Sequence, residues 1–129
     1  MKDEIGLWID QKKTVIVDGS GHDTTILNSN LETEETKSGA KDYPAEDQHD
    51  RRISGYMNRY YMEVIAHLKG AGNILILGPG EAKLELQKRL AAAGLEKKIV
   101  RVENADKLTN RQLAARVRDF FATQKQAAY

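Results

Sequence analysis

The amino-acid sequence predicts one α/β domain, in which a short antiparallel segment is followed by alternating helices and strands. Three observations support this fold class. Two runs of β-branched and aromatic residues stand near the N-terminus, three later segments place apolar residues at helical spacing, and an unbroken apolar run follows the first of these segments. The 129 residues, of which 40% are hydrophobic, are enough for one core and too few for two. We therefore expect residues 1–129 to form a single domain.

The first elements are predicted to be three strands of an antiparallel meander. Residues 5–9 and 14–17 are rich in β-branched and aromatic side chains and flank four polar residues, which is typical of a hairpin. Asp18-Gly19 predicts a tight turn, because both residue types tolerate a positive φ. Residues 24–27 then form the third strand.

The segment from residue 28 to about residue 51 has almost no apolar side chains and many carboxylates. Such a sequence does not bury enough surface to offset the entropy of ordering, so we expect a mobile acidic loop. Beyond it, helical spacing of apolar residues predicts a helix over residues 53–69. The apolar positions of this helix are Ile53, Tyr56, Met57, Tyr60, Val64 and Leu68.

A strand and a second helix are predicted to follow. Residues 73–77 form an unbroken apolar run, which is typical of a strand buried on both faces in a partly parallel sheet. Gly78-Pro79-Gly80 breaks this strand, and Glu81 begins a helix that ends at Gly94, with Leu95 as the apolar contact beyond it.

The last two elements are a strand over residues 99–102 and a helix that extends to about Gln124. Thr109 and Gln112 have the spacing of a capping box and predict where this helix begins. The element order is therefore β-β-β-α-β-α-β-α, which is the order of the ribonuclease-H-like fold. That fold has three layers, with helices on both faces of a mixed five-stranded sheet of order 3-2-1-4-5.

The composition excludes several classes of chemistry. The absence of Cys rules out disulfides, thiolate nucleophiles and Cys-based metal sites, and favours a reducing compartment. The apolar stretch at residues 5–9 is too short for a signal peptide, and no stretch approaches the roughly 18 apolar residues of a spanning helix. We expect a soluble, cytoplasmic protein without membrane contact.

The charges are unevenly distributed, with a net charge of −7 in residues 1–50 and +8 in residues 51–129. A basic half favours contact with a polyanion such as RNA, because arginine and lysine bind phosphate oxygens. Solvated helix faces explain the same residues without any partner. The candidate RNA-binding residues are Arg51, Arg52, Arg59, Lys88, Arg89, Lys97, Lys98 and Arg101, and three further arginines, Arg111, Arg116 and Arg118, line the last helix.

The turn before the second helix is a candidate anion site. Gly78 and Gly80 would expose backbone N–H groups at a helix N-terminus, and Lys83 would add a positive charge. The segment completes neither a P-loop nor a dinucleotide-binding motif, and the carboxylate of Glu81 would occupy the same helix end. A purely structural turn is the alternative.

A metal-dependent nuclease is the enzymatic alternative on this fold. Asp10, Glu63 and Asp119 are the carboxylates that would hold Mg²⁺. Gly78 and Pro79 stand where the fourth strand should end in a further acid. The three histidines, His22, His49 and His67, do not have the spacing of a metal site.

Four stretches of the chain together resemble a known family: GLWIDQKKTVIV, NRYYMEVIAHL, ILILGPGEAKLELQKRL and KIVRVENADKLTNRQLAARVRDFF. They are similar to the middle domain of archaeal and eukaryotic peptide-chain release factors and Pelota, and more closely to bacterial stand-alone relatives classed as translational machinery components. The resemblance implies a ribonuclease-H-like domain that, in the larger factors, enters the ribosomal A site. This chain lacks the Gly-Gly-Gln tripeptide with which that family directs water onto peptidyl-tRNA.

Three functions therefore remain open. The first is a non-catalytic module without a cofactor, which contacts the ribosome, tRNA or a translation factor through its basic half. The second is the Mg²⁺-dependent ribonuclease. The third is a protein-interaction or homo-oligomerisation domain that pairs through the edge of its first or third strand.

Overall fold

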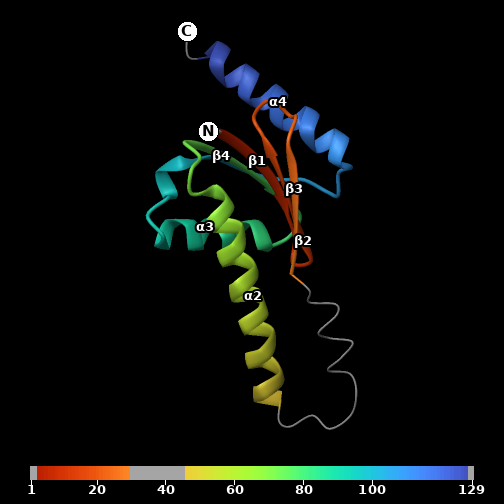
Figure 1. Cartoon of the computed structure of the whole chain (residues 1–129), viewed down its shortest axis with the longest axis vertical. Helices are drawn as coiled ribbons and strands as arrows, with labels where there is room; N and C mark the ends of the chain where they lie inside the picture. Colours follow the sequence, from red (N-terminus) through yellow and green to blue (C-terminus); the bar gives the residue numbers. More distant parts are fainter. Residues whose placement is uncertain (1–2, 30–45, 128–129) are drawn as a thin grey trace.

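The hydrophobic pattern corresponds to one sheet and the helices that cover it. The structure, a computed structural model, describes residues 3–29 and 46–127, and the side chains of residues 3–29 and 55–124. Figure 1 shows the elements in chain order. They are β1 (Glu4–Ile9), β2 (Lys13–Asp18), β3 (Thr24–Asn28), α2 (Glu46–Leu68), β4 (Asn73–Gly78), α3 (Ala82–Ala92), the 3-10 turn η1 (Glu96–Lys98), β5 (Ile99–Asn104) and α4 (Asn110–Ala127).

The five strands form a mixed sheet in the order β3-β2-β1-β4-β5. β2 is antiparallel to both β1 and β3, which makes the predicted meander. β4 is parallel to β1, and β5 is parallel to β4. The predicted fold class, element order and strand order are confirmed.

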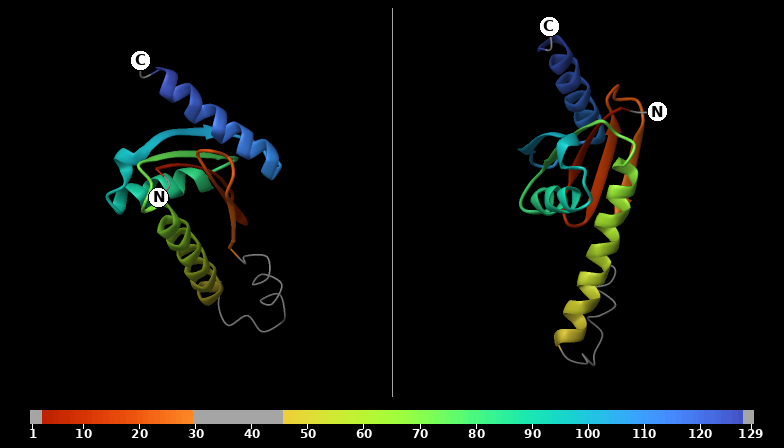
Figure 2. Two further views of the ribbon diagram at one scale, coloured as in Figure 1. Left: turned by 45° about the horizontal axis from the view of Figure 1, so that its top comes forward. Right: turned by 90° about the vertical axis from the view of Figure 1, so that its left-hand side faces the viewer.

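The sheet separates two layers of helices, because alternate side chains of each strand point to opposite faces. On β4, Ile74 and Ile76 pack in the core beneath α2 and α3, whereas Leu75 and Leu77 pack beneath α4. All four are fully buried, as the unbroken apolar run predicts. Figure 2 shows α4 on one side of the sheet and α2 with α3 on the other.

Two aspartates organise the turns of the meander. The Asp10 carboxylate accepts hydrogen bonds from the backbone N–H groups of Lys12 and Lys13, both at 2.8 Å. Asp18 does the same for a wider loop, accepting from the N–H groups of His22 and Asp23. The predicted turn over residues 18–21 is present and is closed by the Gly21 N–H, which donates to the Asp18 carbonyl at 2.9 Å. Its left-handed residue is Gly21, at φ 81°, and not Gly19 as expected.

The predicted end of α3 is confirmed in detail. Gly94 adopts φ 80°, its N–H donates to the Ala91 carbonyl, and the Leu95 N–H donates to the Leu90 carbonyl. These two bonds form a Schellman motif, in which a glycine without a Cβ reverses the chain.

The predicted start of α4 is also confirmed. The Thr109 N–H donates to the Gln112 side-chain oxygen at 2.9 Å, and the Gln112 N–H donates to the Thr109 hydroxyl at 3.0 Å. This reciprocal pair is the capping box that the spacing predicts. Further along, Val117 packs directly on Gly6 of β1, where any side chain would collide with it.

The helix α2 begins at Glu46, seven residues before the predicted start at Ile53. The prediction of a loop to residue 51 is therefore wrong for its last residues, and residues 30–45 lie outside the described part of the chain. Apolar spacing marks only the part of a helix that packs on a core, while Glu, Gln and Arg favour helix without packing. Figure 1 shows the first turns of α2 projecting beyond the sheet.

Among the described residues, no helix combines the length and the apolar character needed to cross a bilayer.

Candidate functional site between α2 and α3

The strands β1 and β4 end side by side at a switch point of the sheet. They are parallel neighbours, and the chain continues from β1 to β2 on one side and from β4 through α3 to β5 on the other. Open α/β sheets bind ligands outside the carboxyl ends of strands at such a point. Gly78 allows the two strand ends to approach, because a Cβ there would collide with the carbonyl oxygen of Ile9.

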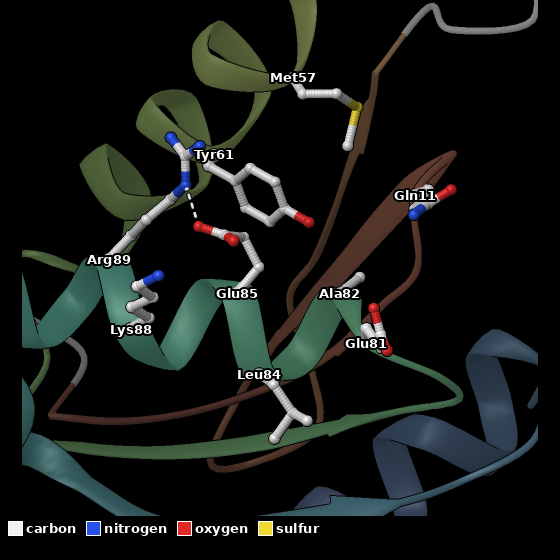
Figure 3. A pocket seen from close by; sticks show the side chains of 9 residues that line it. All are labelled: Gln11, Met57, Tyr61, Glu81, Ala82, Leu84, Glu85, Lys88 and Arg89. Atoms are coloured by element: carbon white, nitrogen blue, oxygen red, sulfur yellow. Dashed lines mark hydrogen bonds and ion pairs between the residues drawn. The ribbon is translucent and has the colours of Figure 1, made fainter. Parts of the chain in front are cut away.

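Two adjoining hollows lie at this end of the sheet. One, of about 390 Å³, lies between α2 and α3 and is drawn in Figure 3. The other, of about 410 Å³, lies between the β1–β2 turn and the turn before α3. They share Gln11, Glu81 and Ala82. We call the first hollow the α2–α3 groove, and its lining residues are Gln11, Met57, Tyr61, Glu81, Ala82, Leu84, Glu85, Lys88 and Arg89.

Arg89 forms one wall of the groove and is held from several sides. Its guanidinium donates to the Glu85 carboxylate at 2.8 Å and to the Asn58 side-chain oxygen at 2.8 Å. It also lies over the ring of Tyr61, 4.7 Å from the ring centroid. These contacts connect α2 with α3, so Arg89 has a structural role and its charge is balanced by Glu85.

Tyr61 differs from its neighbour Tyr60, although both rings are buried, with exposed fractions of 4% and 2%. The Tyr60 hydroxyl bonds with the Thr14 hydroxyl at 2.6 Å and donates to the Asp10 carbonyl at 2.9 Å. The Tyr61 hydroxyl bonds with no other described residue and points into the groove in Figure 3. Burial raises the pKa of Tyr61, with a further contribution from Glu85. The hydroxyl is therefore protonated at neutral pH and able both to donate and to accept a hydrogen bond.

The two ends of the groove have side chains of opposite charge. Lys88 lies beside Arg89 at one end, and Gln11 and Glu81 lie at the other, with Met57 and Ala82 between them (Figure 3). The side chains of Lys88 and Glu81 are exposed, and neither makes an ion pair within the described part of the chain. Since Glu85 is paired with Arg89, the unpaired charges of the groove are one cation and one anion.

The structure brings the candidate anion-site residues together in the turn before α3. Gly80 adopts φ 61°, which favours glycine. Lys83 is 94% buried, since its exposed fraction is 6%, and its ammonium donates to the Gly80 carbonyl. Lys83 thus closes the turn on its own backbone, as in the structural alternative, while anion binding at Gly78, Gly80 and Lys83 stays a prediction.

The candidate RNA-binding residues lie in three places. Arg59, Lys88 and Arg89 are on the α2–α3 side, and Arg59 stacks on Tyr56 at 5.1 Å. Lys97 and Lys98 are in η1, which follows α3, and Lys98 donates to the Lys69 carbonyl.

Arg101 is on the opposite face, over the ring of Phe120 and paired with Glu103. Arg51 and Arg52 belong to the backbone of α2, but their side chains lie outside the described residues. The predicted basic residues therefore do not form one continuous surface within the described part of the chain.

The three carboxylates of the nuclease hypothesis are not brought together. The Asp10 carboxylate is bonded to the backbone of the β1–β2 turn. Glu63 is exposed on α2, and Asp119 is exposed on α4, beyond the sheet, beside Arg118. No group of three or more His, Cys, Asp or Glu side chains among the described residues is arranged to hold a metal ion.

The sequence predicts a functional role for two polar residues of the groove, Lys88 and Arg89, but not for Tyr61 or Gln11. Tyr61 stands next to Tyr60 but outside the predicted apolar stripe of its helix, and Gln11 stands in a hairpin turn. Only their spatial proximity distinguishes them. Two consecutive tyrosines in one helix were the one available signal. Neighbouring residues of a helix point in different directions, so Tyr60 and Tyr61 are not expected to have the same surroundings.

No family model matches the chain, and no curated protein matches it by sequence. Solved structures do match in fold. The Pelota protein of Thermoplasma acidophilum superposes with a TM-score of 0.57 and 17% identity, over 98% of this chain and 35% of the Pelota chain. An archaeal translation termination factor superposes with a TM-score of 0.54 and 12% identity, over 95% of this chain and 39% of that chain.

These likenesses confirm the fold resemblance predicted from the sequence. At 17% and 12% identity, they concern the fold alone. The chain spans 35% and 39% of the two proteins that it matches. Nearly all of it therefore shares its fold with part of the Pelota protein and with part of an archaeal translation termination factor.

Proposed function

We propose that this chain is a non-catalytic, translation-associated module that contacts the ribosome or tRNA through basic side chains on the α2–α3 side and in η1, the turn that follows α3. The observation that supports it most is the shared fold, because two translation proteins match nearly the whole chain. The positions of the free cations give a second line of support. Binding of this kind needs no metal ion or cofactor.

The cations differ in how much of their charge is available to a phosphate. Lys88 and Lys97 are exposed and unpaired among the described residues, and Arg59 is exposed over Tyr56. Arg89 is balanced by Glu85 and bonded to Asn58. We therefore assign phosphate contact to Arg59, Lys88 and Lys97 and a structural role to Arg89.

The test is co-sedimentation of the purified protein with ribosomes across a salt series. Binding to phosphates releases counterions, so the affinity should fall steeply with salt, with a slope that reports the number of phosphate contacts. The double variant Lys88→Glu/Lys97→Glu should weaken binding at low salt and lower this slope by about 2, one for each lost contact. Its fold should be intact, because neither side chain is paired.

A matched control has the same change in net charge on the other side of the sheet. Lys107→Glu/Arg111→Glu alters two exposed cations in and before α4. We expect its binding to stay close to that of the original protein. Equal losses in both double variants would mean that net charge alone governs association, and absence of association at low salt would remove the ribosome from the proposal.

A further inference from the structure

The α2–α3 groove contains a polar group that the fold does not use. Tyr61 has an exposed fraction of only 4%, yet its hydroxyl is unpartnered within the described part of the chain and points into the groove (Figure 3). No side-chain nitrogen or oxygen among the described residues is both buried and without a hydrogen-bond partner, so this hydroxyl is open to solvent in the groove. It is therefore available to a ligand that replaces the water bonded to it.

The rest of the lining restricts the chemistry of that ligand. The middle of the groove combines the apolar side chains of Met57 and Ala82 with the Glu85 carboxylate, which is paired with Arg89. Methionine adapts its shape to flat groups because it is unbranched and polarizable. The unpaired ammonium of Lys88 stands at one end, and the Gln11 amide and Glu81 carboxylate stand at the other. A matching ligand has an anionic group, an apolar flat body and hydrogen-bonding groups at its far edge.

We propose that the α2–α3 groove binds one unstacked nucleotide of RNA, with its phosphate at Lys88 and the edge of its base at Tyr61, Gln11 and Glu81. The inference rests on the proposed function and deepens it by naming the part of an RNA that this site takes. Single-stranded RNA is recognised in this way, through splayed bases whose edges are hydrogen-bonded by the protein. The volume of about 390 Å³ is near the lower end of ligand pockets and suits one flat group.

The far end of the groove also predicts which bases it prefers. The Glu81 carboxylate only accepts hydrogen bonds, so it favours a base with an exocyclic amine. Adenine, cytosine and guanine have such an amine, and uracil does not. AMP, CMP and GMP should therefore bind more tightly than UMP.

The test is a titration of the full chain with AMP, CMP, GMP and UMP, followed by backbone amide shifts in NMR. Saturable shifts should concentrate at residues 81–89 and at residues 57–61. Ribose 5-phosphate has the phosphate without the base and should bind about tenfold more weakly than AMP, since the contacts of the base are lost.

Three variants separate the contacts. Tyr61→Phe removes only the hydroxyl and should weaken nucleotide binding by up to about tenfold, the effect of one hydrogen bond. Lys88→Gln should weaken all four nucleotides alike, whereas Lys107→Gln, on the other side of the sheet, should leave them unchanged. Glu81→Gln should reduce the difference between UMP and the other three.

Three results would overturn the inference. They are equal shifts with ribose 5-phosphate and AMP, unchanged affinity in Tyr61→Phe, and saturation by a peptide of mixed charge but by no nucleotide, which would assign the groove to a protein partner. The proposed function is judged separately by the salt series. Tyr61→Phe should lower ribosome affinity without changing the salt slope, because the substitution removes no charge. If nucleotides fail to bind while salt-sensitive association persists, the groove inference fails and the proposed function stands.

Discussion

The described basic residues on the two faces of the sheet differ in their partners. On the α4 face, Glu103 pairs with Arg101 at 3.1 Å and with Arg116 at 2.6 Å, and Arg118 lies beside Asp119. On the α2–α3 face, Lys88 is unpaired and the Tyr61 hydroxyl has no partner among the described residues. Three arginines of the α4 face therefore have carboxylate partners, although Arg111 has none among the described residues, whereas Lys88 and the Tyr61 hydroxyl on the α2–α3 face are available to a ligand.

Because of this difference, a count of charges does not tell which cations are available to a phosphate. A cation that is already paired must break its pair before it binds a phosphate, whereas an unpaired cation exchanges only water and counterions. The same holds for hydroxyl groups, as Tyr60 and Tyr61 illustrate. The following predictions test whether the α4 face supports the fold and the α2–α3 face supports binding.

The largest expected effect is on the α4 face, in the variant Leu113→Ala. Leu113 is 1% exposed and packs with Trp8 and Val117 beneath α4. Its truncation leaves a cavity, so the free energy of unfolding should fall by about 2–5 kcal/mol. Urea denaturation measures the loss.

The groove should be unaffected in the fraction of Leu113→Ala that remains folded, because Leu113 belongs to the other core cluster. Nucleotide affinity of that fraction, measured at low temperature, should match the original protein. A large change in affinity would contradict the separation of the two faces.

The second prediction compares two neighbouring substitutions, Tyr60→Phe and Tyr61→Phe. The first leaves the Thr14 hydroxyl and the Asp10 carbonyl without their buried partner, so the free energy of unfolding should fall by about 1–3 kcal/mol. The second removes a hydroxyl that has no described partner, so the change should lie within about 0.5 kcal/mol. Parallel urea titrations of the two variants provide the measurement.

These two substitutions are matched in chemistry, helix and burial, so each is the control of the other. Equal losses of stability would mean that Tyr61 has a hydrogen bond that is equivalent to that of Tyr60. In that case the Tyr61 hydroxyl would not be available to a ligand.

The spacing of apolar residues and the local end motifs were sufficient to predict the fold, because each element has a signal within its own segment of the sequence. The capping box of Thr109 and Gln112 and the Schellman end at Gly94 are local motifs, and both are present as predicted. The start of α2 could not be predicted, because residues 46–52 form helix without an apolar stripe. Apolar spacing indicates which part of a helix packs on the core, and it gives no sign of a helical segment that projects beyond the core.

The site was predicted less well, because it depends on contacts between distant residues. Charge alone predicts that Lys88 and Arg89 both bind RNA. In the structure, however, Arg89 is hydrogen-bonded to Glu85 and to Asn58, which is 31 residues away in the sequence. The same reasoning grouped Arg101 with them, although its side chain lies over Phe120 on the opposite face of the sheet. Sequence spacing along one element does not reveal such partners, and the Tyr61 hydroxyl was missed for the same reason.

A smaller effect is expected from Thr109→Ala at the start of α4. The substitution removes one half of the capping box, so the Gln112 N–H loses its acceptor. The free energy of unfolding should fall by about 1 kcal/mol. Thr109→Ser keeps the hydroxyl and should restore most of it, so a similar loss in both variants would contradict the role of the cap. Nucleotide affinity should stay unchanged in both.

The smallest expected effect is that of Glu103→Gln, which removes the partner of two arginines. The side chains of Arg101 and Arg116 are 57% and 49% exposed, and exposed ion pairs contribute about 0–1 kcal/mol, less at high salt. The substitution leaves two unpaired arginines on the α4 face. If that face takes no part in binding, ribosome association and its salt slope should stay as in the original protein. Tighter binding with a steeper slope would show that the paired arginines on the α4 face bind the ribosome once their carboxylate partner is removed. The two faces would then differ only in how many of their cations are available for binding.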